Sequence, residues 1–142
     1  ELSVATQIYR HLSATLPGIL DVSCAPHVMN TVVKIEQQYE GHAQAVFAEV
    51  YGVNADYSKV CIVVDEDVDI NDFNDVYWAC LTRASAQRDM TIVRDLPGFY
   101  RDPHKDHWGR LSIDATRPWG RQADFERTSV PGADRIDLRA YF

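Results

Sequence analysis

The chain has 142 residues, of which 46% are hydrophobic and 25% charged, and 14 basic against 21 acidic residues give a net charge of −7. This length suits one compact domain, and the hydrophobic fraction argues against a disordered chain. The acidic balance, without any basic run, argues against a nucleic acid or an anionic membrane surface as partner. The apolar runs are too short to span a bilayer.

The hydrophobic pattern predicts helices that alternate with strands. Apolar residues recur every four positions between residues 4 and 16, and Pro17 and Gly18 follow this stretch, which indicates a helix and its end. Residues 60–64 form a continuous apolar run, typical of a strand covered on both faces. In chain order the expected elements are a helix over 2–16, strands over 19–25 and 28–35, a helix over 41–50, a strand over 60–64, a helix over 72–83, and strands over 90–93 and 111–113. This order predicts an α/β fold, with a mixed β-sheet flanked by helices in a single domain.

The three cysteines are an odd number and are widely spaced. Cys24, Cys61 and Cys80 cannot form a disulfide framework or a zinc quartet by themselves. We expect them to be small buried side chains. No secretory signal opens the sequence, so a reducing, cytoplasmic location is the expectation.

Acidic residues are crowded in the eleven positions that follow the apolar strand. They are Asp65, Glu66, Asp67, Asp69, Asp72 and Asp75. A calcium-binding loop would need Gly at the sixth position and Glu at the twelfth, where this sequence has Ile70 and Val76. The sequence therefore argues against a calcium loop.

Three other functions for these acidic residues stay open. Asp65 and Asp67 could hold a divalent metal and a pyrophosphate, as in nucleotide-sugar transferases. A pair of carboxylates could instead act as an acid and a base. Alternatively, Asp69, Asn71 or Asp72 could accept hydrogen bonds from the free N–H groups at the start of the next helix.

Histidines offer a weaker candidate for a metal site. His104 and His107 lie close to Asp102 and Asp106, but without the fixed helical spacing that makes such pairs convincing. We interpret this segment as a solvated loop. His42 follows a glycine at a helix start and is expected to be structural.

Residues 60–83 resemble the signature of the UbiD family's C-terminal domain. In both, an apolar strand leads into a turn with paired acids, and a helix follows that carries Trp78-Ala79 and ends in Thr82-Arg83. The blocks at 38–43 and 109–116 resemble the same family in order and spacing. The similarity reaches about Trp119. It implies that residues 1–119 form a UbiD-type C-terminal α/β domain. Residues 120–142 do not match the family, and we expect them to be a polar C-terminal tail that packs on a partner subunit.

This resemblance implies an activity and a division of labour. UbiD-type enzymes reversibly decarboxylate aromatic or α,β-unsaturated carboxylic acids. Their N-terminal and central regions bind prenylated FMN with a divalent metal (manganese) and potassium, and supply a Glu-Arg-Glu catalytic set. Their C-terminal domain helps to form homodimers or higher homo-oligomers and closes over the substrate pocket.

This sequence has no flavin-binding motif and no Glu-Arg-Glu motif. Because the flavin supplies the electron sink, we expect no catalytic, cofactor-binding or metal-binding residue in this chain, and no activity from the chain alone. Its expected partners are the flavin-bearing regions of the same enzyme, further copies of itself and an aromatic acid. The alternatives from other classes are the nucleotide-sugar transferase with Asp65 and Asp67, and a stand-alone interaction domain.

The resemblance also suggests which side chains face the substrate. Apolar residues in loops beside strand ends are candidates, since ligand sites in open sheets gather there. Phe99 is the first candidate, followed by Ile70, Phe73 and Tyr100. For Phe73, the first core position of its helix is the alternative. Trp78 and Trp119 are expected to pack against other domains.

Overall fold

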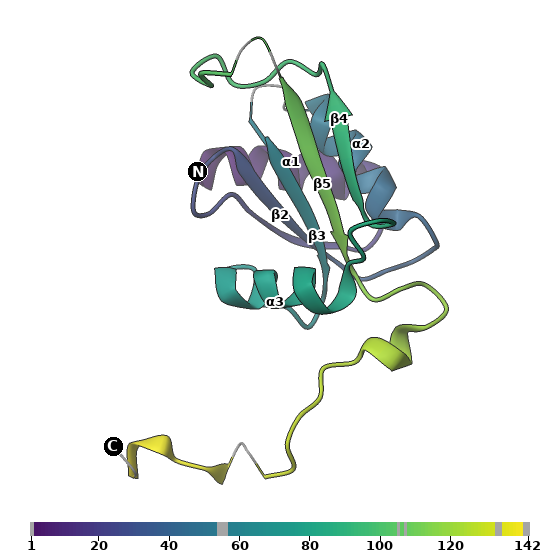
Figure 1. Ribbon diagram of the computed structural model, residues 1–142, viewed down its shortest axis with the longest axis vertical. Coiled ribbons are helices and arrows are strands. Elements are labelled where there is room, and N and C mark those ends of the chain that lie inside the picture. The colour runs from purple at the N-terminus through teal and green to yellow at the C-terminus, as the bar shows by residue number, and fades with distance from the viewer. Residues whose placement is uncertain (1, 54–56, 105, 107, 133–134, 141–142) are drawn as a thin grey trace.

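The computed structural model describes residues 2–53, 57–104, 106, 108–132 and 135–140. They form a layered α/β domain followed by a C-terminal segment that extends away from it (Figure 1). The elements in chain order are α1 (Leu2–Thr15), β1 (Ile19–Ser23), β2 (Asn30–Ile35), α2 (His42–Val53), β3 (Val60–Asp65), α3 (Phe73–Arg83), β4 (Met90–Arg94), β5 (Gly109–Ala115), and the short 3-10 helices η2 (Gln122–Phe125) and η4 (Leu138–Ala140).

The five strands form one mixed sheet in the order β1-β2-β3-β5-β4. The three inner strands β2, β3 and β5 are parallel, whereas the edge strands β1 and β4 pair antiparallel with their neighbours. The continuous apolar run forms the central strand, and its side chains from Cys61 to Asp65 are buried. The predicted α/β class and mixed sheet are confirmed.

Helices cover both faces of this sheet. Cys61 and Val63 of β3 point to the face on which α1 and α2 pack. Ile62 and Val64 point to the opposite face, where α3 packs through its buried residues, including Val76. This alternation follows from the two-residue period of a strand, and it divides the hydrophobic core into two layers.

The late strand is longer than predicted. The sequence pattern indicates only residues 111–113, but β5 extends from Gly109 to Ala115. Arg110, Ser112 and Asp114 alternate with the apolar positions and point to the α2 side, where Ser112 contacts the Tyr51 hydroxyl at 2.7 Å. Because specific polar contacts satisfy these residues, the strand lacks the apolar signature that would reveal it.

The bounds of the early strands also differ from the prediction. β1 ends at Ser23 and β2 begins at Asn30, since the intervening residues form a turn in which the Asn30 side chain donates to the Ala25 carbonyl at 2.6 Å. The turn between α1 and β1 depends on Gly18, which has φ +68° and lies against the Glu36 carbonyl, so no Cβ fits there.

All three cysteines are buried, as predicted. Burial raises the pKa of the Cys80 thiol to about 11, and it also raises the pKa of Cys61. None of the helices in the described ranges has the length and apolar character that a membrane crossing requires.

Replacing Ile8 by Ala is predicted to lower the free energy of unfolding by about 2–5 kcal/mol, because its side chain is buried between α1 and the sheet and a cavity would remain. Urea denaturation followed by circular dichroism measures the change. Leu2→Ala in the exposed first turn of the same helix is the control, with an expected change below about 0.5 kcal/mol. Equal losses in the two variants would contradict this packing.

Candidate functional site

The acidic turn after β3 is built around one buried carboxylate. The Asp65 side chain is 1% exposed. Its Oδ2 accepts hydrogen bonds from the Arg83 guanidinium at 3.1 Å and from the Arg117 backbone N–H at 2.6 Å, and its Oδ1 accepts from the Gln37 amide at 3.2 Å. Asp65 therefore connects the end of α3 with the segments that follow β5 and β2.

Arg83 is shared between Asp65 and Asp67, the two carboxylates that the transferase alternative assigns to a metal. Its buried guanidinium donates two hydrogen bonds to Asp67, at 2.8 and 2.7 Å, in addition to the bond to Asp65. Paired donors of this kind match the geometry of a carboxylate. Because both carboxylates already contact an arginine, the arrangement does not support the transferase alternative. Among the described residues, no group of three or more His, Cys, Asp or Glu side chains is placed to hold a metal ion.

The pKa values of Asp65 and Asp67 are shifted in opposite directions. Burial raises the pKa of Asp65, and the Arg117 N–H together with the charges of Arg117 and Arg83 opposes this rise. The hydrogen bonds from Arg83 lower the pKa of Asp67, which lies nearer the solvent. Asp67 is therefore ionised throughout the neutral range, so the buried guanidinium always has a charged partner.

Asp69, Asp72 and Asp75 accept hydrogen bonds from backbone N–H groups at or just before the start of α3. Asp72 is the N-cap, and its side chain accepts from the Asn74 backbone N–H at 2.9 Å. Asp69 accepts from the Asn71 N–H at 2.9 Å, and Asp75 accepts from the Asp69 N–H at 2.8 Å. The capping alternative is confirmed for Asp72.

After β5 the chain crosses one flank of α3, and we call residues 117–128 the strap. The Arg117 guanidinium contacts Glu66 and, at 2.7 Å, Glu126. Arg127 donates to both carboxylate oxygens of Asp75, at 2.7 and 3.1 Å, and its guanidinium lies 4.0 Å from the centre of the Trp78 ring. The strap is thus held by ion pairs and by a cation–π contact.

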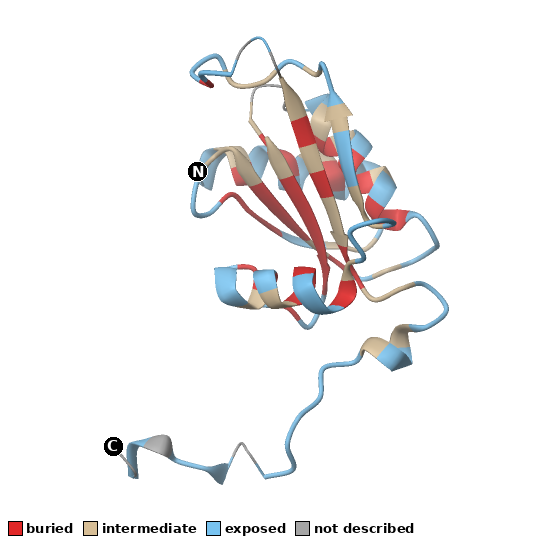
Figure 2. Cartoon of the chain, viewed as in Figure 1, coloured by how far each residue is buried: buried red, intermediate tan, exposed pale blue. Residues whose placement is uncertain are grey.

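The rest of the tail leaves the domain, and we call residues 129–140 the arm. The residues of the arm whose burial is described are exposed (Figure 2), and Val130 and Ile136 are among them. Within the described residues its hydrogen bonds are local, such as that from the Arg135 N–H to the Gly132 carbonyl at 3.0 Å. The predicted polar tail therefore consists of two parts, one attached to α3 and one that extends away from the domain.

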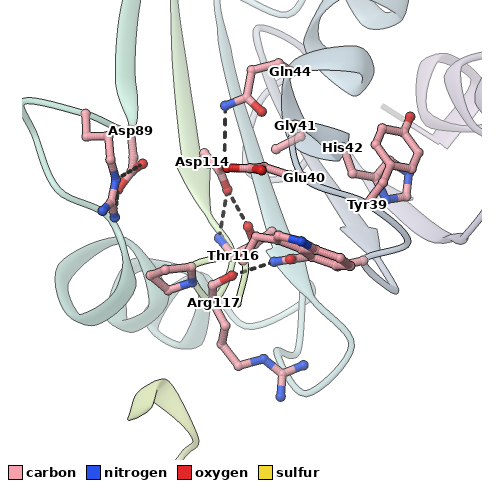
Figure 3. Close-up of a pocket in the computed structure, with 14 residues that line it drawn as sticks. Tyr39, Glu40, Gly41, His42, Gln44, Asp89, Asp114, Thr116 and Arg117 are labelled. Carbon is pink, nitrogen blue, oxygen red and sulfur yellow. Dashed lines mark hydrogen bonds and ion pairs between the residues drawn. The ribbon is translucent and has the colours of Figure 1, made fainter. Parts of the chain in front are cut away.

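A cavity of about 350 Å³ opens at the C-terminal ends of β2 and β5, beside the start of α2 (Figure 3). Asp114 lies at its centre. Its Oδ1 accepts from the N–H and hydroxyl of Thr116, and its Oδ2 contacts the Gln44 amide at 3.4 Å. Burial raises the pKa of Asp114. His42 is buried at the start of α2, stacked on Tyr39, which agrees with its predicted structural role.

The charges around this cavity do not suit a flavin phosphate, because Glu40, Asp89 and Asp114 line it and its arginines already contact carboxylates. Two arginines line the cavity. Arg88 contacts Asp89 at 2.9 Å, and the Arg117 side chain points toward Asp65 and Glu66. Within the described part of the chain, this cavity accordingly offers no fit for the phosphate of prenylated FMN.

The first predicted substrate residue lies in the loop between β4 and β5. Phe99 forms an aromatic cluster with Tyr57 and Tyr100, with ring centres 5.3 and 4.9 Å away. The buried Asp102 fixes this loop, because it accepts from Lys59 at 2.6 Å and from the His104 N–H at 3.0 Å. Asp102 thus has a structural role, whereas His107, the other histidine of the weak metal-site candidate, lies outside the described residues.

The Arg110 side chain of β5 also holds this loop in place. It donates to the Pro97 carbonyl at 2.6 Å and to the Ser58 carbonyl at 3.0 Å. The guanidinium also lies 5.2 Å from the Tyr51 ring of α2. One buried side chain therefore connects the aromatic loop, the start of β3 and α2.

The other two predicted substrate residues lie at the opposite end of the strands, after the C-terminal end of β3. Ile70 is 3% exposed and belongs to the core layer under α3. Phe73 is 51% exposed and stacks on Tyr77, so it is not the core residue that the alternative supposed. Since β4 runs antiparallel to β5, the Phe99 loop lies beside the start of β3, one strand length (roughly 20 Å) from these residues. A single pocket in one copy of the domain cannot include all four side chains.

Several residues of the acidic network are not apparent from the sequence pattern alone. Gln37 and Arg117 lie in loops far from Asp65 in the sequence. Only the parallel pairing of β2, β3 and β5 brings them together, at the C-terminal ends of these strands. Arg110 and Asp114 fall within the 109–116 block, whose family similarity is the sequence signal that marks them.

Replacing Asp65 by Asn is predicted to lower the free energy of unfolding by about 3 kcal/mol, because it leaves the buried Arg83 with one charged partner fewer. Urea denaturation measures the loss. Asp124→Asn, which removes one member of an exposed i,i+3 ion pair, is the control and should change stability by less than about 0.5 kcal/mol. A wild-type stability in Asp65→Asn would contradict the structural role of this carboxylate.

The Asp75 carboxyl is predicted to titrate below its ordinary pKa of 3.8, because Arg127 donates to its ionised form. The folded-state pKa is thus depressed, so the stability from this pair is present above about pH 3.8 and is lost as the pH falls through the lower folded value. NMR titration of the carboxyl carbon measures the midpoint. Arg127→Gln should raise it, whereas Arg121→Gln should not; an unchanged midpoint in Arg127→Gln would refute the contact.

Comparison with known proteins identifies relatives of this domain. Residues 1–115 match the family model of the 3-octaprenyl-4-hydroxybenzoate carboxy-lyase C-terminal domain. The UbiD-class enzyme HmfF from Pelotomaculum thermopropionicum in complex with FMN is 30% identical with a TM-score of 0.87, over 99% of this chain and 33% of that chain. An evolved dimeric form of HmfF in complex with prFMN is 28% identical with a TM-score of 0.79, over 99% of this chain and 30% of that one.

A third solved relative is the vanillic acid decarboxylase of Sedimentibacter hydroxybenzoicus in its closed form. It is 26% identical with a TM-score of 0.77, over 94% of this chain and 30% of that chain. This chain thus spans about a third of the length of these relatives. The match over residues 1–115 shows that the chain belongs to the UbiD family, as its carboxy-lyase C-terminal domain.

Proposed function

We propose that this chain is the C-terminal domain of a UbiD-class carboxy-lyase that decarboxylates an aromatic or α,β-unsaturated carboxylic acid. The family match over residues 1–115 is the observation that carries this proposal. The similarity to HmfF and to a vanillic acid decarboxylase supports it. Since the chain spans about a third of these relatives, we assign the chemical step to a region of the polypeptide outside it.

The cofactor of the complete enzyme would be prenylated FMN, with manganese and potassium. HmfF has been solved with FMN and with prFMN, which supports a flavin. The cavity beside α2 does not fit the flavin phosphate, so we place the flavin in the other regions of the enzyme. In this proposal the 142-residue chain alone has no decarboxylase activity.

The domain would contribute to assembly and to the wall of the substrate pocket. Phe99 and Tyr100 are the side chains that we propose for the wall, because the Asp102 and Arg110 contacts hold their loop in place and Tyr100 is exposed. Ile70 is covered by α3 and does not suit this role. The exposed arm would pack on a partner subunit, which accounts for its apolar Val130 and Ile136.

The proposed function is tested by carbon dioxide release from vanillic acid and related aromatic acids. The complete enzyme loaded with prenylated FMN should release carbon dioxide from at least one of these acids, and the 142-residue chain alone should release none. Activity of the chain alone would refute the assignment of chemistry to other regions. Stoichiometric binding of manganese together with a nucleotide sugar would favour the transferase instead.

Phe99→Ala in the complete enzyme is predicted to change the ratio of kcat/KM between vanillic acid and a smaller aromatic acid by about 10- to 200-fold, since an apolar wall discriminates through modest packing terms. Steady-state kinetics with both acids measures this ratio. Tyr9→Ala, on the far side of the domain in α1, is the control that should leave the ratio unchanged. Equal ratios in Phe99→Ala and wild type would remove Phe99 from the pocket.

A further inference from the structure

The strap crosses one flank of α3 without joining the hydrophobic core (Figure 1). Residues 117–128 all lie in the described part of the chain, and none of them is buried. Its two aromatic side chains are Phe125, which is partly buried, and Trp119, which is 45% exposed. Segments with few buried apolar contacts are the first to open in a folded protein. Apolar packing therefore does not account for the position of the strap.

A cavity lies between the strap and the helix. It has a volume of about 580 Å³, and residues from both segments line it: Trp78, Thr82, Asp124, Phe125, Glu126, Arg127 and Thr128. Side chains in a protein core are close-packed and leave few spaces larger than a water molecule. A space of this size shows that the strap spans this part of α3 instead of packing on it.

One arginine bridges the strap and α3 beside this cavity. Arg127 donates to both oxygens of Asp75, at 2.7 and 3.1 Å, and its guanidinium lies 3.8 Å from the Asp67 carboxylate. The same guanidinium lies 4.0 Å from the centre of the Trp78 ring. The Arg127 side chain is 40% exposed. Arg127 thus clamps the end of the strap to the acidic turn and to the helix at the same time.

A second arginine joins the two ends of the strap. The Arg117 guanidinium contacts Glu126 at 2.7 Å and also contacts Glu66 of the acidic turn. Glu66 and Glu126 are 44% and 56% exposed. Ion pairs that involve exposed side chains are weak, and dissolved salt screens them. The contacts that hold the far end of the strap are therefore sensitive to ionic strength.

The start of the strap is fixed in a different way. The Arg117 N–H donates to the buried Asp65 carboxylate at 2.6 Å, and the Arg117 carbonyl accepts from the Gln37 amide at 2.7 Å. Three residues later, Gly120 has φ +79° and open space around the position of a Cβ. A glycine in open space changes its backbone dihedral angles without a steric penalty. Gly120 is therefore suited to be a hinge between the fixed start and the clamped end.

We propose that the strap is a latch that opens about Gly120 when the Arg127 clamp is released, while the sheet and its three helices stay folded. In the open state the Trp78 flank of α3 is uncovered, and the arm is no longer directed by its attachment to α3. Salt favours opening, because the Debye length falls from about 10 Å at roughly 0.1 M to about 3 Å at roughly 1 M. The latch goes beyond the proposed function, which requires no movement of the tail.

The buried ion pair of the domain should not respond to salt in the same way. The side chains of Asp65 and Arg83 are each 1% exposed, and buried pairs are screened much less than exposed ones. α3 is also held by apolar packing, through Val76 and Ala79 in the core layer beneath it. Opening is therefore confined to the strap and the arm that follows it.

Paramagnetic relaxation in the 142-residue chain tests the latch. A nitroxide is attached to Thr128→Cys at the end of the strap or, in a second sample, to Ser129→Cys just outside the cavity lining; the native cysteines are buried and should not react. At low salt each label should broaden the amide signals of Trp78 and Thr82 on α3. The broadening should be largely lost at about 1 M sodium chloride and, at low salt, in Arg127→Gln.

Arg121→Gln is the matched control for the clamp. Arg121 belongs to the same strap, but the contacts of its guanidinium, to Asp124 at 3.2 Å and to the Phe125 ring, lie within the strap. This variant should therefore keep the broadening of the wild type at low salt. The dispersed amide signals of β3 check in every sample that the domain is folded.

Four outcomes would overturn the latch. Broadening that neither salt nor Arg127→Gln reduces would show that other contacts hold the strap, and an equal loss in Arg121→Gln would show that Arg127 is not the clamp. No broadening at low salt from either label would place the strap away from α3. Loss of the β3 signals together with the broadening would show that the strap opens only when the domain unfolds. Carbon dioxide release by the complete enzyme tests the proposed function separately.

Discussion

The structure depends on the buried carboxylate of Asp65 at the end of the central strand. It binds the Arg83 guanidinium of α3, the Arg117 backbone after β5 and the Gln37 amide after β2. A lone charge in this position would be costly, and removing one partner of such a group destabilises the fold because the other remains buried. The pairing therefore fixes where α3 leaves the sheet and where the strap begins.

This use of the acids decides what the domain can do chemically. A strand followed by alternating carboxylates is compatible with metal binding, but here Asp67 and Asp65 are both paired with Arg83, and Asp72 caps a helix. The carboxylates thus stabilise the scaffold. The exposed surface also includes large apolar side chains, namely Tyr100 beside Phe99 and Phe73, Tyr77 and Leu81 on α3. Such surfaces suit packing against other protein or an aromatic acid, in line with a domain that assembles and encloses.

The fold is largely predictable from the sequence, because apolar periodicity marks α1 and β3 directly. β5 is harder to predict from the sequence, because the polar residues Arg110, Ser112 and Asp114 are satisfied by contacts that only the tertiary structure supplies. The candidate site is less predictable still. Ile70 and Phe99 both follow strands, but β4 runs opposite to β3, so the two residues lie at opposite ends of the strands. Strand direction depends on pairing with distant residues, which local patterns do not encode.

A double-mutant cycle between Asp65 and Arg83 tests the central claim most directly. The free energies of unfolding of Asp65→Asn, Arg83→Met and the double variant are compared with that of the wild type. If the carboxylate is a structural partner of the guanidinium, the double variant should be more stable than the sum of the single losses predicts, by about 2 kcal/mol or more. Strictly additive losses would show that the two side chains do not depend on each other, and would contradict this account of the fold.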